Sequence, residues 1–157
     1  DTGSSYFNNT SPTNSVFSVG NYNGSNGSND NMIAYCFADV QGYSKFSSYT
    51  GNGNADGPFV YTGFKPAFVM VKATSTTSDW NIMDDKRAVS FNPNTKELYA
   101  NSSSAEATGG QTIRDYLSNG FKLRGTSGGT NGSGVSYIYM AFGQSIVGSN
   151  NVPNNAR

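Results

Sequence analysis

The chain has no histidine and a single cysteine, Cys36, among its 157 residues. The lack of an imidazole excludes Ser-His-Asp and Cys-His catalysis, together with most zinc sites. One cysteine allows no disulfide within the chain, so stability must come from packing, with neighbouring subunits as a further source. Because Cys36 lies inside an apolar run, we expect it to be a small buried hydrophobic residue and not a reactive thiol.

Charge and long apolar runs are also scarce. Only 13% of the residues are charged, and ten basic and ten acidic residues give a formal net charge of zero. A nucleic-acid-binding protein normally shows a basic stripe, which this sequence lacks. No apolar run approaches the roughly 20 residues that span a bilayer, and no signal-peptide pattern opens the chain. We expect neither nucleic acid nor membrane insertion.

Turn-forming and aromatic residues are abundant instead. Gly, Asn, Ser and Thr are over-used, and Gly and Asn tolerate the positive φ of tight turns. Ten Tyr, ten Phe and one Trp are too bulky for a disordered chain. The length suits one domain, which we place at residues 16–157, after an N-terminal arm or linker at 1–15. The first residue is Asp1, not Met, so we expect a piece of a longer protein.

Strand-like patterns recur along this domain, whereas helical periodicity is essentially missing. Residues 67–72 form a nearly continuous apolar run, which is typical of a strand covered on both faces, and 67–84 reads as one hairpin. Residues 113–117 fit a helical turn or a strand. The other predicted strands are 16–19, 32–38, 58–62, 96–100, 120–124 and 135–142. This pattern predicts an all-β fold, an antiparallel β-sandwich or jelly roll with long Gly/Asn-rich loops.

Two of the predicted hairpins resemble each other. Each has an Asn-Gly-Ser turn, at 26–28 and at 131–133, followed five residues later by Ile and four residues after that by Phe. The matching pairs are Phe17 with Phe121, Val19 with Leu123, Ile33 with Ile138 and Phe37 with Phe142. We interpret them as two related hairpins, although any Asn/Gly-rich hairpin would look similar.

The densest aromatic segment, residues 34–72, contains our candidate binding surface. We expect a long loop between strands at 35–40 and 67–72, because aromatic residues there alternate with small turn-formers. Rigid aromatic faces combined with adaptable amides suit binding, and Tyr faces stack well on sugars. The candidate ligand-binding residues are Tyr43, Tyr49, Asn52, Asn54 and Asp56. The alternative, that these aromatic rings belong to the core or to a subunit interface, stays open.

The acidic residues offer weak candidates for chemistry. Asp84 and Asp85 are adjacent, so on an extended chain they point to opposite faces and cannot flank one substrate bond. The other carboxylates are scattered singly, at Asp39, Asp56, Asp79, Glu97, Glu106 and Asp115. Residues 52–57 have the oxygen spacing of the first half of a calcium loop, but no Glu completes it. We predict no metal, no cofactor and no enzymatic activity, with a glycosidase as the remaining catalytic alternative.

Several longer motifs carry a family resemblance. They resemble a domain, largely of unknown function, found at the C-terminal end of tail-fibre-like structural proteins of marine bacteriophages. The resemblance implies a virion protein, a fibre or spike, that forms a homo-oligomer, with trimers usual for tail fibres, and contacts other virion proteins. It supplies no defined catalytic or binding residues. The motifs are residues 34–46, 49–53, 56–66, 69–72, 119–124, 137–142 and 153–157.

These observations lead us to expect a non-enzymatic distal domain of a phage tail fibre or spike that attaches to host-surface glycan. The alternatives are a head-fibre or capsid decoration protein, a free-standing carbohydrate-binding module, and a polysaccharide-degrading spike that uses paired carboxylates. Light scattering, glycan binding and release of reducing ends would separate them.

Overall fold

The computed structural model describes residues 4–87, 92–108 and 113–144, and it divides the chain into two compact units. The first unit is Asp1–Phe37 and the second is Ala38–Arg157. The two units divide after Phe37, and the domain boundary predicted after residue 15 stays a prediction. Each unit is described by itself below.

The first unit contains two one-turn helices, α1 (Ser4–Phe7) and α2 (Asn23–Asn26). The rings of Tyr6 and Tyr22 lie 4.5 Å apart. No hydrophobic side chain in its described residues, 4–37, is buried. The strands predicted at 16–19 and 32–38 are absent from it, so both predictions were wrong. A strand needs hydrogen bonds to a neighbouring strand, and an alternation of apolar and polar residues does not by itself provide that neighbour.

The second unit holds the two β-sheets. Among the described residues, the larger sheet has six strands in the order β1-β9-β3-β4-β5-β6, and the smaller has three in the order β2-β8-β7. The strands are β1 (Ser44–Thr50), β2 (Phe59–Tyr61), β3 (Pro66–Ala73), β4 (Asn81–Asp84), β5 (Lys96–Tyr99), β6 (Ala107–Thr108), β7 (Arg114–Leu117), β8 (Gly120–Leu123) and β9 (Ser136–Gly143).

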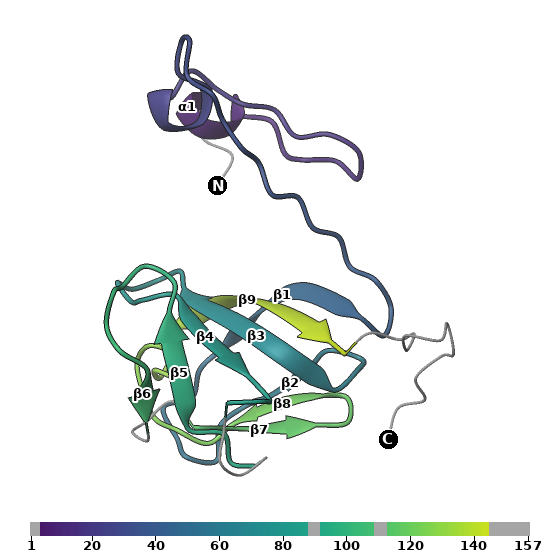
Figure 1. The fold of residues 1–157 in the computed structure, drawn as a ribbon, viewed down its shortest axis with the longest axis vertical. Coiled ribbons are helices and arrows are strands. Elements are labelled where there is room, and N and C mark those ends of the chain that lie inside the picture. Colours follow the sequence, from purple (N-terminus) through teal and green to yellow (C-terminus); the bar gives the residue numbers. More distant parts are fainter. Residues whose placement is uncertain (1–3, 88–91, 109–112, 145–157) are drawn as a thin grey trace. The chain divides into compact units, whose positions relative to one another are not determined.

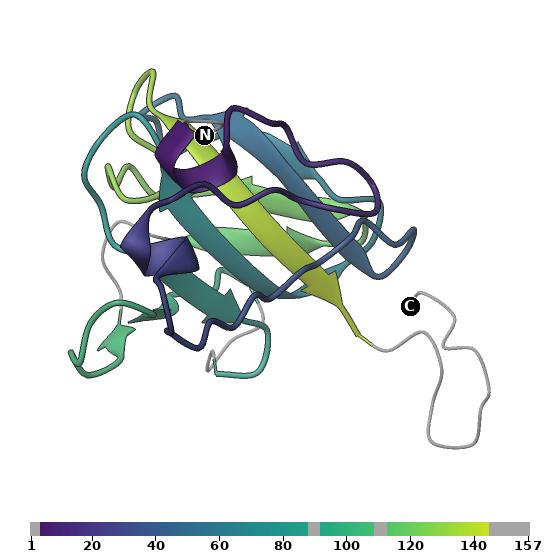
Figure 2. The same cartoon turned by 90° about the horizontal axis from the view of Figure 1, so that it is seen from above.

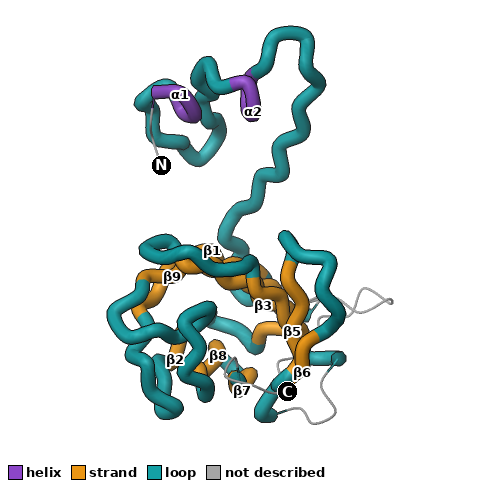
Figure 3. The backbone as a smooth tube through the Cα atoms, turned by 90° about the vertical axis from the view of Figure 1, so that its left-hand side faces the viewer, coloured by secondary structure: helices purple, strands orange, loops and turns teal. Residues whose placement is uncertain are grey.

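The two sheets form two layers (Figure 1), and Figure 3 shows them from the side, with β1, β9, β3 and β5 in one layer and β2, β8 and β7 in the other. The strands of the two layers cross when seen from above (Figure 2). Every strand pairing described is antiparallel. The prediction of an all-β, sandwich-like fold is confirmed. No helix among the described residues is long and apolar enough to cross a bilayer.

The hydrophobic core lies between these layers, because both sheets turn alternate residues towards each other. Val69 and Val71 come from β3, Phe121 and Leu123 from β8, and all four are fully buried. Rings from β9 fill the remaining space, with Phe121 and Tyr139 meeting edge to face at 5.5 Å. The core cluster is completed by Val60, Phe64, Ala73, Tyr116, Tyr137 and Ala141.

Most of the strands predicted in the second unit are present. The hairpin predicted at 67–84 forms as β3 and β4, which pair antiparallel through Val69 and Met83. The predictions at 58–62, 96–100, 120–124 and 135–142 correspond to β2, β5, β8 and β9. Residues 113–117, which the pattern left undecided, contain the strand β7.

The two related hairpins do not form. β8 pairs with β2 and β7 in the small sheet, whereas β9 pairs with β1 and β3 in the large one. The first of the two similar segments contains no strand among its described residues. The similarity thus reflects shared turn residues and apolar spacing, which is the alternative interpretation. Cys36 is exposed, so its predicted burial was also wrong, because the strand expected around it is absent.

Candidate functional site

The face of the large sheet that points away from the core carries a straight row of apolar side chains. Phe46 of β1 lies opposite Met140 of β9, and Met140 lies opposite Met70 of β3. Met70 in turn lies opposite Ile82 of β4, which lies opposite Leu98 of β5. These five residues, here called the outer row, cross five strands without a charge. Their neighbours along each strand point to the other face, towards the core.

One part of this face is hollowed. The outer hollow has a volume of about 480 Å³, a size that suits a small ligand. Its lining is almost wholly apolar, and the hydroxyl of Tyr139 is directed elsewhere, to the carbonyl of Tyr61 at 3.2 Å. The residues that line the hollow are Phe46, Ser47, Ser48, Met70, Trp80, Ile138, Tyr139 and Met140.

Trp80 is the largest side chain at this hollow and is 37% exposed. It directly precedes β4, and its backbone is held on both sides. Its amide donates to Oδ1 of Asn101 at 2.8 Å, and its carbonyl accepts from the amide of Ala100 at 3.1 Å. Asn101 is fixed in turn by Asp79, because its Nδ2 donates to Oδ1 of Asp79 at 2.8 Å. These bonds hold the backbone from which the partly exposed indole projects.

The predicted binding residues Asn52, Asn54 and Asp56 lie together in one exposed loop, but their polar groups serve the loop itself. Oδ1 of Asn52 accepts from the amide of Asn54, and Oδ1 of Asn54 accepts from the amide of Asp56, both at 2.9 Å. Nδ2 of Asn52 donates to the carbonyl of Asp56 at 3.0 Å. The described residues contain no group of three or more acidic, His or Cys side chains that could hold a metal.

The buried residue Asn131 supports this loop from below. Its Oδ1 accepts from the amide of Asn52 at 2.9 Å, and its Nδ2 donates to the carbonyls of Asn54 and Gly125 at 2.9 and 2.8 Å. Sequence reasoning noticed Asn131 only as a turn residue. A fully buried side-chain amide with three hydrogen bonds orders a loop, because each buried donor or acceptor would be costly to leave without its hydrogen bond.

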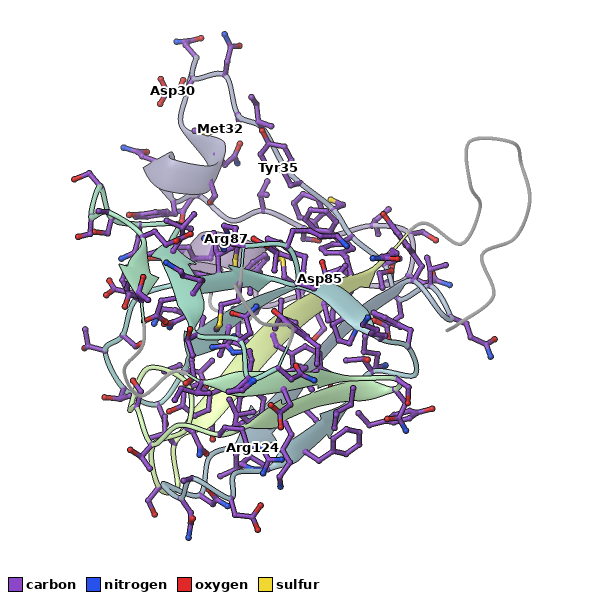
Figure 4. The ribbon with its side chains drawn as sticks, turned by 60° about the horizontal axis from the view of Figure 1, so that its bottom comes forward. Asp30, Met32, Tyr35, Asp85, Arg87 and Arg124 are labelled. Atoms are coloured by element: carbon purple, nitrogen blue, oxygen red, sulfur yellow. The ribbon has the colours of Figure 1, made fainter. Side chains whose placement is uncertain are left out.

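Asp56 is the charged member of the loop. Its carboxylate lies 2.9 Å from Nζ of Lys122 and 3.8 Å from an Nη of Arg124. The hydrogen bond from Lys122, more than the charges themselves, holds the pKa of Asp56 below its usual value. Figure 4 labels Arg124 on the side of the small sheet. The loop is therefore a surface ion-pair site and lies apart from the outer hollow, whose lining includes none of these residues.

Tyr49 lies in β1 and packs against the core, and not in the long loop where the sequence had placed it. Its ring stacks on Tyr137 with centroids 5.0 Å apart, and its hydroxyl donates to the carbonyl of Thr130 at 2.6 Å. Burial raises the pKa of the Tyr49 phenol well above its usual value. The correction has a simple cause: an aromatic and serine-rich segment can be a strand as readily as a loop.

Tyr43 precedes β1, at the end of that strand opposite to residues 52–56. Its ring lies 6.1 Å from Phe142 and is 38% exposed. A strand of this length spans roughly 20 Å. The structure thus brings Asn52, Asn54 and Asp56 together and places Tyr43 and Tyr49 elsewhere.

The carboxylates near the end of β4 are paired with cations. Asp84 bonds to Nε of Arg87, and Arg87 reaches Oε2 of Glu106 at 3.2 Å. Nζ of Lys96 reaches the other oxygen of Glu106 at 3.1 Å. Asp85 and Arg87 are labelled in Figure 4. Burial would raise the pKa of Asp84, but the hydrogen bonds from Arg87 outweigh it and lower that pKa. A carboxylate stabilised in its charged form is poorly suited to act as a general acid.

The residues of the outer hollow were not predicted as a site, although one signal for them was present. The apolar run at 67–72 indicated a strand covered on both faces. Val69 and Val71 are buried in the core, whereas Phe68 and Met70 are only half-buried on the outer face. A contiguous apolar patch on the open side of a sheet is typical of a surface that binds a ligand or a partner. The pairing of strands that aligns these residues could not be read from the sequence.

Comparison with known proteins identifies one family. The family described as a domain of unknown function (DUF7483) matches residues 1–145. No curated protein and no solved structure matches the chain.

Proposed function

The chain belongs to this family, and we propose that it is a non-enzymatic attachment domain of a bacteriophage tail fibre or spike. In this proposal it is part of the virion, forms a homo-oligomer of three copies with other virion proteins beside it, and binds host-surface glycan at the outer hollow. The viral setting rests on the resemblance of its motifs to those of tail-fibre-like proteins. The place of binding rests on the hollow.

The observation that carries the binding proposal is the pairing of Trp80 and Phe46 in one shallow apolar hollow. Sugar rings present apolar C–H faces that stack on aromatic rings, and Trp offers the widest such surface. The backbone bonds of Trp80 to Asn101 and Ala100 order this platform before a ligand arrives, which lowers the entropic cost of binding. Ser48, which shares the outer face with Phe46, adds a polar residue to the lining of the same hollow.

A catalytic reading has less support. Glycoside hydrolysis needs two carboxyl groups that face each other across a substrate, with one of them protonated. The hollow is lined by no carboxylate. Asp84 and Glu106 form ion pairs, and the pKa of each is lowered.

A direct test measures binding of host polysaccharides and their oligosaccharide fragments by glycan array and calorimetry. We expect Trp80→Ala to weaken binding at least tenfold, because loss of one stacking ring removes about 1.4 kcal/mol or more. The matched control is Tyr61→Ala, which removes another exposed ring, 63% exposed, from β2 of the other sheet. Equal binding by Trp80→Ala and the native chain, or equal losses in both variants, would contradict the proposal.

The outer row favours a second candidate. Five apolar side chains aligned across five strands also suit a protein partner, as in a head-fibre or capsid decoration protein. In that case the native chain would show no detectable glycan binding. Trp80→Ala would instead weaken binding to another virion protein. A free-standing carbohydrate-binding module would bind glycan as a monomer.

A further inference from the structure

Among the described residues, none that lines the outer hollow is charged. Lys72 lies opposite Ile138 on the same face of the sheet, but it is not part of the lining, and its Nζ donates to the carbonyl of Ala73 at 2.8 Å. A carboxylate, sulfate or phosphate group that entered this hollow would lose its hydration without gaining a cation from the lining. The hollow therefore favours an uncharged sugar unit.

Hydrogen-bonding groups are also scarce at the hollow. The strand β9 lies between β1 and β3, so its backbone amides and carbonyls serve the two ladders and are not offered to a ligand. The hydroxyl of Tyr139 donates to the carbonyl of Tyr61. Ser48 is the polar lining residue that shares the outer face. A sugar hydroxyl buried here would leave water and find few partners, which costs free energy.

Two methionines and an isoleucine supply the aliphatic part of the lining. Met70 and Met140 lie opposite each other in the ladder between β3 and β9. Ile138, which is 44% exposed, lies two residues before Met140 and so shares its face. Methionine side chains adapt to the shape of an apolar group, because they are unbranched and polarisable. Together with the ring of Trp80, this lining suits a sugar that carries an apolar substituent on a hydroxylated ring.

We propose that the sugar unit bound at the outer hollow is a 6-deoxyhexose. Such a sugar carries a methyl group in place of the hydroxymethyl group of an ordinary hexose, so it is uncharged and lacks one hydroxyl. Its methyl group packs against Met70, Met140 and Ile138, and its C–H face stacks on Trp80, while its hydroxyls stay in water. An N-acetyl group also ends in a methyl, but its amide would be costly to bury with it. This inference rests on the proposed function, glycan binding at the outer hollow, and names the class of sugar.

Pairs of sugars that differ only in this substituent test the preference. The native chain is titrated, with NMR detection, with the methyl glycosides of L-fucose and L-galactose and with those of L-rhamnose and L-mannose. In at least one pair the deoxy sugar should bind about tenfold or more tightly, because an apolar site discriminates against an added hydroxyl to roughly this extent. Equal affinities within both pairs would overturn the inference. Tighter binding of the methyl glycoside of glucuronic acid or of N-acetylglucosamine would overturn it as well.

Two glutamine variants connect the preference to the hollow. Met70→Gln places an amide in the lining on a side chain of similar length, so it should reduce the preference for the deoxy sugar about fivefold or more. Leu98→Gln is the matched control, since Leu98 belongs to the same outer row, is 36% exposed and does not line the hollow. It should keep the native preference. An unchanged preference in Met70→Gln, or equal losses in both variants, would refute the inference.

Saturation-transfer NMR on the native chain gives a reading that needs no variant. The strongest transfer should reach the methyl group of the deoxy sugar, and strongest transfer to another part of the ring would contradict the inference. The proposed function is tested separately. Glycan binding that Trp80→Ala abolishes, without a preference for deoxy sugars, would leave the proposed function standing and refute this inference. A native chain that binds no glycan would refute both.

Discussion

At the scale of single residues, two tyrosines that look alike in the sequence have different surroundings. Tyr49 stacks on Tyr137, meets Phe121 edge to face at 6.2 Å and donates to a backbone carbonyl. Tyr43 is 38% exposed, and its ring lies 6.1 Å from that of Phe142. Aromatic clusters of the first kind stabilise the fold, whereas an exposed ring contributes little to it.

This contrast predicts unequal effects of truncation. Tyr49→Ala should lower the free energy of unfolding by about 3–5 kcal/mol, because it opens a cavity in a packed aromatic cluster. Tyr43→Ala should lower it by less than about 1 kcal/mol, as expected for a partly exposed side chain. Urea denaturation followed by tyrosine and tryptophan fluorescence measures both. Similar losses in the two variants would contradict the assignment of Tyr49 to the core and restore it as a candidate for binding.

At the scale of the elements, β3 shows how far the sequence predicts the fold. Its apolar run predicted a strand at 67–72, and the polar loop after it predicted a hairpin with the next strand. Both predictions were possible because these features are local in the sequence. The strand β1 was missed, since its sequence Ser-Lys-Phe-Ser-Ser-Tyr-Thr is polar enough to read as a loop. The opposite error occurred at 32–37, where strong strand character did not produce a strand.

The candidate site was harder to predict than the strands. The outer hollow depends on the alignment of Phe46 with Met140 and of Met140 with Met70. Those residues are distant in sequence, and strand order and register are set by long-range pairing that no local pattern encodes. The loop at 52–56 was recognised as exposed. The buried Asn131 that fixes it lies 79 residues after Asn52 in the sequence, so no local pattern could show their hydrogen bond.

The charged residues at the end of β4 give a prediction about pH. The pKa of Asp84 is lowered from its usual 3.8 in the folded state, so its ion pair with Arg87 stabilises the fold fully above about pH 4. That stabilisation, on the order of 1 kcal/mol for a partly exposed pair, is lost as pH falls through the lowered pKa. Asp84→Asn should therefore be less stable than the native chain at pH 7, with the difference shrinking towards pH 2.

Urea denaturation at a series of pH values measures this convergence. Arg87→Gln is the matched variant, since it removes the other partner of the ion pair. Its free energy of unfolding should likewise depend less on pH than that of the native chain between pH 7 and pH 2. A stability difference between Asp84→Asn and the native chain that stays constant from pH 7 to pH 2 would show that Asp84 acts through packing and not through its charge.

At the scale of the whole molecule, stability is unequally divided between the two units. The core cluster, both sheets and all the buried apolar side chains described belong to Ala38–Arg157. The described residues of Asp1–Phe37 bury no hydrophobic side chain and contain two one-turn helices. Helices of four residues are far below the length of roughly 12–15 residues at which an isolated helix becomes even marginally stable in water.

This division predicts that residues 38–157 fold alone and residues 1–37 do not. The larger fragment should unfold cooperatively with a melting temperature close to that of the full chain, because its core is complete. The smaller should show the circular dichroism of a disordered peptide, because ordering its backbone without burial is unfavourable. A larger fragment that fails to fold, or a smaller fragment with a cooperative unfolding transition of its own, would contradict this division of stability.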